Sequence, residues 1–211
     1  MKKIMFNDHY GLTQAVLNGE KTMTRRVIPP KVVKYALNVY RQDYFKASLD
    51  YLNDKEALEG WLLSEKKSRY VRGEVVAIAQ CYKNIIDELP DRYREWVLAY
   101  YSGTKAWTNK LYILADLMPN QIKITDVKIE RMQDITDEDC LKEGVICETF
   151  DDGTPLCYKV AGLYDNPKSL LLKSYATPRT AFIALIDCLN GGHKGLWESN
   201  PWVVVYEFVL K

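Results

Sequence analysis

The residues most able to do chemistry lie close together near the start of the chain, in Lys21-Thr22-Met23-Thr24-Arg25-Arg26. If a strand begins at Met23, Thr24 and Arg26 share one face, because strand side chains alternate between two faces. Lys21, in the preceding turn, can lean over the same face. Arginine offers a planar fork for a phosphate or a base edge, and lysine offers a point charge. The set therefore suits an anionic or carbonyl-bearing ligand.

A buried lysine beside a threonine hydroxyl can also act as the base that activates a nucleophile. The alternative for Lys21, Arg25 and Arg26 is a solvated basic turn that binds nothing. A further alternative is an interaction protein without a ligand, in which side chains would fill the cleft. These alternatives stay open on the residues alone.

The elements that must position these residues can be read from turn signals and periodicity. A helix is predicted over 12–18, ended by Gly19, followed by a strand from Met23 that Pro29-Pro30 ends. A bulge is predicted at Thr125-Asp126, where the alternation of apolar residues slips by one. Further strands are predicted over 4–6, 73–82, 122–131 and 202–209, and a turn-rich hairpin over 146–169. Further helices are predicted within 31–68 and over 91–101, 136–144 and 179–189. Because strands and helices do not alternate in a βαβ rhythm, the predicted class is α+β with a barrel-like sheet.

Composition limits the classes of function. With 211 residues, 47% hydrophobic and 27% charged, the chain fits one globular domain with a sizeable core. A formal net charge of +1 provides no basic field for duplex DNA, so no such partner is expected. The sequence has neither a signal peptide pattern nor a run of about 18 apolar residues, so a cytoplasmic protein without a membrane partner is expected. The five cysteines lack C-x-x-C spacing and the two histidines lie far apart. No disulfide framework, metal or cofactor is therefore expected, and the oligomeric state stays open.

The spacing Gly19-x-Lys21-x-x-Thr24-x-Arg26 resembles the signature of the ASCH family, which belongs to the PUA-like superfamily. Three other segments agree with that family in the same order. They are Gly73-Glu74-Val75-Val76, residues 129–136 with Glu143-Gly144-Val145, and residues 182–190 with 197–203. The resemblance implies a single domain over 1–211 built as a PUA-like mixed β-barrel with flanking helices. Residues 31–68 and 84–120 would be helical insertions.

The resemblance implies two functions. ASCH domains are thought to bind RNA in a cleft beside the barrel, so Lys21, Thr24, Arg25 and Arg26, with Gln80, would bind RNA or a modified nucleoside. Some small members are amidohydrolases that deacetylate N4-acetylcytidine. In those members the signature lysine and threonine, with a glutamate on a following strand, form the catalytic group. Lys21 and Thr24 match the first two of these three residues.

The acidic partner is the open question for the hydrolase. Many relatives place an acidic residue at the position of Gln80, and glutamine can neither accept a proton nor supply a negative charge. Glu74 is one substitute, but it lies six residues earlier, roughly 20 Å away along an extended strand. Glu130 or Glu207 from another strand could also complete the group. Binding of RNA or a nucleoside is therefore the primary expectation, and the amidohydrolase is the alternative.

Overall fold

The main element of the computed structural model is an open, mixed five-stranded sheet with the order β1-β3-β4-β8-β2. Residues 1–44, 53–64, 68–166, 168–191 and 195–211 are described. The strands are β1 (Lys3–Ile4), β2 (Met23–Val27), β3 (Val75–Ile78), β4 (Gln121–Arg131) and β8 (Trp202–Leu210). β1 runs parallel to β3, and the other neighbours are antiparallel. The predicted α+β class is confirmed, but β1 and β2 are the two edges of this sheet, so the described strands do not close a barrel.

β4 and β8 lie at the centre of the sheet, and β8 is apolar on both faces. Val203 and Val205 of β8 are buried on one face, and Val204 and Tyr206 are buried on the other. A strand covered on both sides reads as a continuous apolar run, as this one does. The register of β4 against β8 shifts between Ile124 and Asp126, which confirms the predicted bulge.

Three predicted helices are confirmed, and each lies beside β2 or the core. α1 (Leu12–Leu17) is followed by Gly19 at φ 76°, in the left-handed region. α6 (Asp137–Lys142) begins where the Thr136 side chain accepts a hydrogen bond from the Asp139 amide. α7 (Pro178–Leu189) has Pro in its first turn and buries Phe182 against the core. α6 packs against both α7 and β2.

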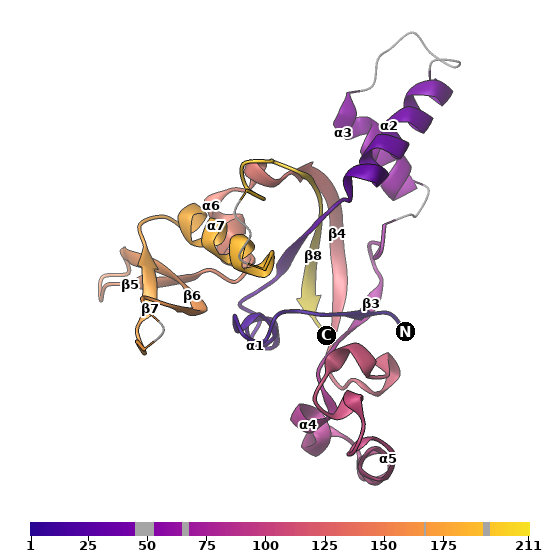
Figure 1. The fold of residues 1–211 in the computed structure, drawn as a ribbon, viewed down its shortest axis with the longest axis vertical. Helices are drawn as coiled ribbons and strands as arrows, with labels where there is room; N and C mark the ends of the chain where they lie inside the picture. The colour runs from indigo at the N-terminus through magenta and orange to yellow at the C-terminus, as the bar shows by residue number, and fades with distance from the viewer. Residues whose placement is uncertain (45–52, 65–67, 167, 192–194) are drawn as a thin grey trace.

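Two helical segments extend from opposite ends of the sheet (Figure 1). One contains α2 (Pro30–Tyr44), α3 (Asp54–Glu59) and a π-helical turn at Gly60–Ser64; the remainder of the predicted helical region 31–68 lies partly outside the described residues. The other contains α4 (Tyr82–Ile85), α5 (Asp91–Tyr101) and several 3-10 turns, around a small core of its own. The predicted strand over 73–82 is shorter in the structure, since α4 begins at its end.

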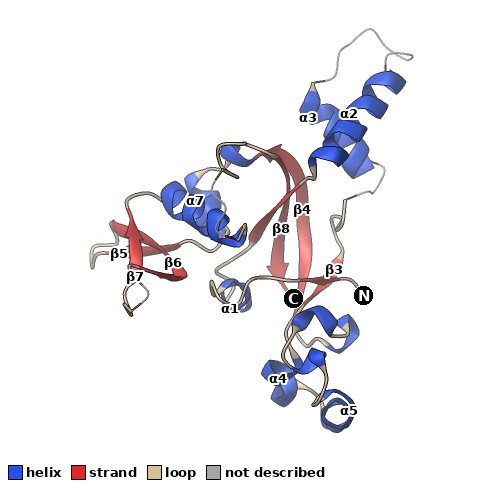
Figure 2. Ribbon diagram, viewed as in Figure 1, coloured by secondary structure: helices blue, strands red, loops and turns tan. Residues whose placement is uncertain are grey.

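A second, three-stranded sheet lies on the far side of α7 from the main sheet (Figure 2). It consists of β5 (Ile146–Thr149), β6 (Pro155–Tyr164) and β7 (Leu172–Tyr175), so the predicted hairpin is extended by a third strand. Among the described helices, none is long and apolar enough to cross a membrane.

Candidate functional site

A pocket of about 670 Å³ lies against β2, the strand that carries the signature residues. One wall is formed by residues 5–9, which follow β1, and another by one face of α7. Lys21, Thr24, Arg25 and Arg26 all line it, whereas Gln80 does not. The structure thus brings four of the five expected ligand-binding residues to one cavity.

Lys21 is buried and makes three short hydrogen bonds. Its side chain is only 2% exposed, and Nζ donates to the Met23 carbonyl at 2.7 Å and to the Glu143 carbonyl at 2.6 Å. The third bond goes to the Glu143 carboxylate, Oε2, at 2.7 Å. Burial lowers the pKa of Lys21 from its ordinary 10.5, while the charge and hydrogen bond of Glu143 act to raise it. Lys21 and Glu143 therefore form a buried ion pair in which the ammonium is less favoured than in water.

Glu143 is the acidic partner that the sequence did not reveal, and the end of α6 positions it. It is the C-terminal cap of that helix, and Gly144 follows at φ 104°, in the left-handed region. A Cβ at Gly144 would lie 3.0 Å from the Leu12 side chain and 3.6 Å from that of Lys21. Glycine is required there for both reasons, and it lets the turn pack closely on the lysine. The Thr22 amide also donates to the Lys142 carbonyl at 3.0 Å, which fastens the signature segment to α6.

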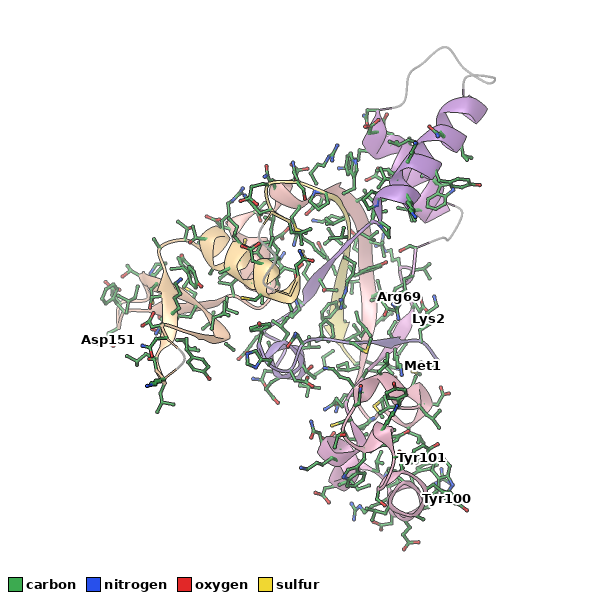
Figure 3. The ribbon with its side chains drawn as sticks, in the orientation of Figure 1. Met1, Lys2, Arg69, Tyr100, Tyr101 and Asp151 are labelled. Carbon is green, nitrogen blue, oxygen red and sulfur yellow. The ribbon has the colours of Figure 1, made fainter. Side chains whose placement is uncertain are left out.

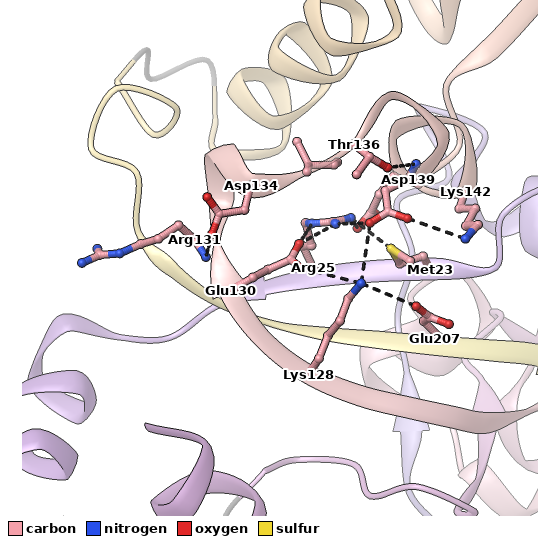
Figure 4. Close-up of polar contacts among 12 residues, drawn as sticks. Met23, Arg25, Lys128, Glu130, Arg131, Asp134, Thr136, Asp139, Lys142 and Glu207 are labelled. Atoms are coloured by element: carbon pink, nitrogen blue, oxygen red, sulfur yellow. Dashed lines mark hydrogen bonds and ion pairs between the residues drawn. The ribbon is translucent and has the colours of Figure 1, made fainter. Parts of the chain in front are cut away.

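Arg25, the next residue along β2, holds a cluster of carboxylates together, and Figure 4 shows it beside Glu130 and Asp139. Its guanidinium contacts Glu130 at 2.6 Å, Asp139 at 2.8 Å and Glu143 at 3.2 Å. Burial opposes the charge of Arg25, but Glu143 and Glu130 raise the pKa of Arg25 above its ordinary value. Each carboxylate oxygen of Glu143 thus meets one cation, Oε2 at Lys21 and Oε1 at Arg25. Arg25 therefore fixes the orientation of Glu143.

Lys128 adds a positive charge on the outer side of this cluster of carboxylates (Figure 4). Its ammonium lies 3.6 Å from Glu207 and 3.7 Å from both Glu130 and Asp139. Burial acts to raise the pKa of Asp139. The hydrogen bond and the charge of Arg25 outweigh this effect and hold that pKa below its ordinary value. The cluster is therefore a network of ionised groups that supports the Lys21–Glu143 pair.

Thr24 and Arg26 line the pocket with polar groups that have no acidic partner among the described residues. Thr24 is buried, and its hydroxyl makes no hydrogen bond within the described part of the chain. Arg26 is exposed and donates to the Met5 carbonyl at 2.8 Å, across to the segment that follows β1. A hydroxyl and a guanidinium therefore face the cavity, beside the buried ion pair.

The other carboxylates considered from the sequence lie elsewhere. Glu74 pairs with Lys2 at 3.0 Å, and Glu207 lies beside Lys128. Glu130 is bound by Arg25. Gln80 accepts a hydrogen bond from Asn120 at the end of β3. None of these carboxylates contacts Lys21.

Within the described ranges, no group of three or more His, Cys, Asp and Glu side chains could hold a metal ion. All five cysteines are free thiols. No family model, curated protein or solved structure matches this chain.

Proposed function

We propose that this chain is an amidohydrolase that removes the acyl group from a small acylated amine, with an acylated nucleoside such as N4-acetylcytidine as the substrate class. One observation carries the proposal. The Glu143 carboxylate lies 2.7 Å from the buried ammonium of Lys21. Thr24 lines the same pocket, and its hydroxyl makes no hydrogen bond to the described residues. A hydroxyl nucleophile needs a neighbouring base, and a base needs a group that orients it. Thr24, Lys21 and Glu143 supply these three roles.

In the proposed reaction Thr24 Oγ adds to the acyl carbon, and its proton passes to the Lys21–Glu143 pair. The pair returns that proton to the amine nitrogen as the carbon–nitrogen bond breaks. Water then hydrolyses the acyl-threonine ester, which releases the acid and restores Thr24. Lys21 receives the proton in its amine form, which the Glu143 carboxylate orients through the 2.7 Å hydrogen bond. Desolvation of the ammonium favours this amine form.

Ligand binding must also rearrange the hydrogen bonds of Lys21. In the structure Lys21 Nζ donates three hydrogen bonds, two of them to backbone carbonyls. Lys21 must exchange one of these carbonyls for the Thr24 hydroxyl. Catalytic hydrogen bonds of this kind often tighten only when the substrate is bound.

We also propose that the open sheet is a PUA-like barrel of the ASCH type, opened along one side. The support is the order of the segments. The signature lies on β2, the Gly73-Glu74 turn precedes β3, and Glu143-Gly144 ends α6. The segments expected as insertions carry α2 and α3 on one side and α5 on the other.

The direct test is release of acetate from N4-acetylcytidine by the purified protein. The wild-type chain should release acetate and cytidine in equal amounts, and Lys21→Met should not exceed the rate without enzyme. Lys123→Met is the matched control, because Lys123 is exposed on β4 and does not line the pocket. If wild-type protein at high concentration turns over neither this nor other acylated nucleosides, the hydrolase is excluded.

The rate should rise with pH. The amine form of Lys21 accepts the Thr24 proton, and its fraction grows as pH increases. Because burial lowers the pKa of Lys21, the rise should level off at a pH below its ordinary 10.5. We expect kcat/KM to increase with pH and to reach a plateau below pH 10.5. A profile that falls as the pH rises toward that plateau would contradict the role of Lys21 as base.

Binding of RNA or a nucleoside without turnover is the second candidate. The three hydrogen bonds of the Lys21 ammonium favour this second candidate. A lysine whose three hydrogens are all donated holds the turn and Glu143 in place and has no hydrogen left for a ligand. In that case N4-acetylcytidine or short RNAs would bind to the pocket, Arg26→Ala would weaken binding, and no acetate would appear.

A further inference from the structure

A second pocket, of about 440 Å³, adjoins the candidate site. The two pockets share Met5, Arg26 and Val27, so Arg26 stands at the boundary between them. Pro29, Val32, Leu62 and residues 68–70 line one side of the second pocket. Val32, Leu62 and Ser68 belong to the first of the two expected insertions, residues 31–68, and Pro29, Arg69 and Tyr70 flank it. The expected insertion and the residues on either side of it therefore form this wall of the cavity beside β2.

Fixed contacts build the wall of this second pocket. The hydroxyls of Ser68 and Tyr206 are 2.9 Å apart and hydrogen-bonded, and both residues are buried. The Tyr70 hydroxyl donates to the Lys3 carbonyl at 2.8 Å, and the Tyr70 ring meets that of Tyr206 edge-on at 5.2 Å. Arg69, between Ser68 and Tyr70 in sequence, is thereby held at the rim of the pocket.

Two guanidinium groups at this pocket have no carboxylate partner within the described residues. They belong to Arg26 and Arg69, and both are exposed. The Arg69 guanidinium lies 5.6 Å from the Tyr70 ring. Arg69 lies beside Lys2 (Figure 3), and its backbone carbonyl accepts a hydrogen bond from the Lys2 ammonium. Burial raises the pKa of the Tyr70 hydroxyl, and the charges of Arg69 and Arg26 both act to lower it. Both arginines line the same pocket as this tyrosine.

The neighbouring cations are already neutralised, which distinguishes these two arginines from them. Lys2 is paired with Glu74 at 3.0 Å, and Lys110 with Asp8 at 2.8 Å. Arg25 contacts three carboxylates. Of these cations, the two without a carboxylate partner among the described residues therefore both line the second pocket, and Arg26 lies where the two pockets meet.

We propose that Arg26 and Arg69 bind a phosphate group of the same ligand whose acyl group lies beside Thr24, so that the substrate is an acylated nucleotide rather than a free nucleoside. This inference rests on the proposed function for the identity of the ligand. Guanidinium groups match the geometry of phosphate oxygens, and two of them at one pocket bind an anionic phosphate far better than a neutral ribose. The phosphate is supplied by either a mononucleotide or a phosphodiester within a short strand.

The test compares N4-acetylcytidine, its 5′-monophosphate and a dinucleotide that contains it, by calorimetric titration of the full chain. Thr24→Val protein is used so that turnover does not interfere. The 5′-monophosphate should bind at least about tenfold more tightly than the nucleoside, and Arg69→Ala should remove most of this gain. Arg72→Ala should keep the gain, because Arg72 is exposed in the same segment but does not line either pocket.

The possible outcomes distinguish the phosphate site from the proposed hydrolase activity. Equal affinity for the nucleoside and its monophosphate would overturn the phosphate site, while acetate release by the wild-type chain would leave the hydrolase intact. Tight binding of the monophosphate that depends on Arg69, without any acetate release, would support the phosphate site and exclude the hydrolase. Tighter binding of the dinucleotide than of the monophosphate would identify a strand as the source of the phosphate. If none of the three ligands binds, the phosphate site is excluded.

Discussion

Replacing Thr24 by valine should lower kcat/KM for amide hydrolysis by about 10³-fold or more, because the attacking oxygen is lost. Valine keeps the β-branched shape of threonine, so β2 and its pairing with β8 should be preserved. The Thr24 hydroxyl makes no hydrogen bond within the described chain, so its loss should leave the melting temperature nearly unchanged. The measurement is acetate release together with thermal unfolding of the same preparation.

Thr22→Val is the matched control for this substitution. Thr22 lies two residues earlier, and its side chain does not line the pocket. This control should retain the wild-type rate.

Rapid denaturation of wild-type protein during turnover should also leave a fraction of the chain with one acetyl group on Thr24, detectable by mass spectrometry. If Thr24→Val keeps its rate to within about tenfold, Thr24 is not the nucleophile, and water activated by the Lys21–Glu143 pair becomes the attacking group.

Replacing Glu143 by alanine should lower the free energy of unfolding by about 3–5 kcal/mol, the usual cost of removing one partner from a buried ion pair. Two cations lose a carboxylate oxygen in this variant, Lys21 at 2.7 Å and Arg25 at 3.2 Å. Lys21 is affected more, because Glu143 is its only carboxylate partner among the described residues, whereas Arg25 keeps Glu130 and Asp139. Denaturant unfolding followed by circular dichroism measures the change.

Glu138→Ala provides the control, since Glu138 is exposed on the first turn of the same helix. Its loss should cost less than about 1 kcal/mol, the usual range for a charge near a helix N-terminus. A second variant, Glu143→Ala combined with Lys21→Met, removes both charges and should recover part of the lost stability. If Glu143→Ala is as stable as Glu138→Ala, the ion pair does not contribute to folding in the way the contacts indicate.

These two variants also separate the two roles of the site. Thr24→Val acts on chemistry alone, and Glu143→Ala acts on chemistry and on the fold. A protein that only binds a ligand would show the stability change without any change in turnover, because there would be none to lose. The pair of results therefore distinguishes a catalytic pocket from a binding pocket with the same charges.

The sequence by itself determined the local elements and the segment that carries the site. Capping residues and glycine stops located α1, α6 and α7, and the slip in alternation located the bulge in β4. These signals act over a few residues, within one helical turn or one pair of strands, so they can be read directly from the chain. For the same reason the alternation that begins at Met23 indicated which side chains of β2 share a face.

Only the tertiary structure decided which carboxylate meets Lys21. Glu143 is 122 residues away in the sequence, and it reaches the lysine because α6 packs on β2 and Gly144 allows a close turn. No local periodicity encodes a contact over that separation. The same limit applies to Gln80, which lies outside the pocket, and to the edges of the sheet, which the structure leaves open. The signature residues predicted which segment lines the pocket. The packing of a distant helix end then placed the Glu143 carboxylate against Lys21.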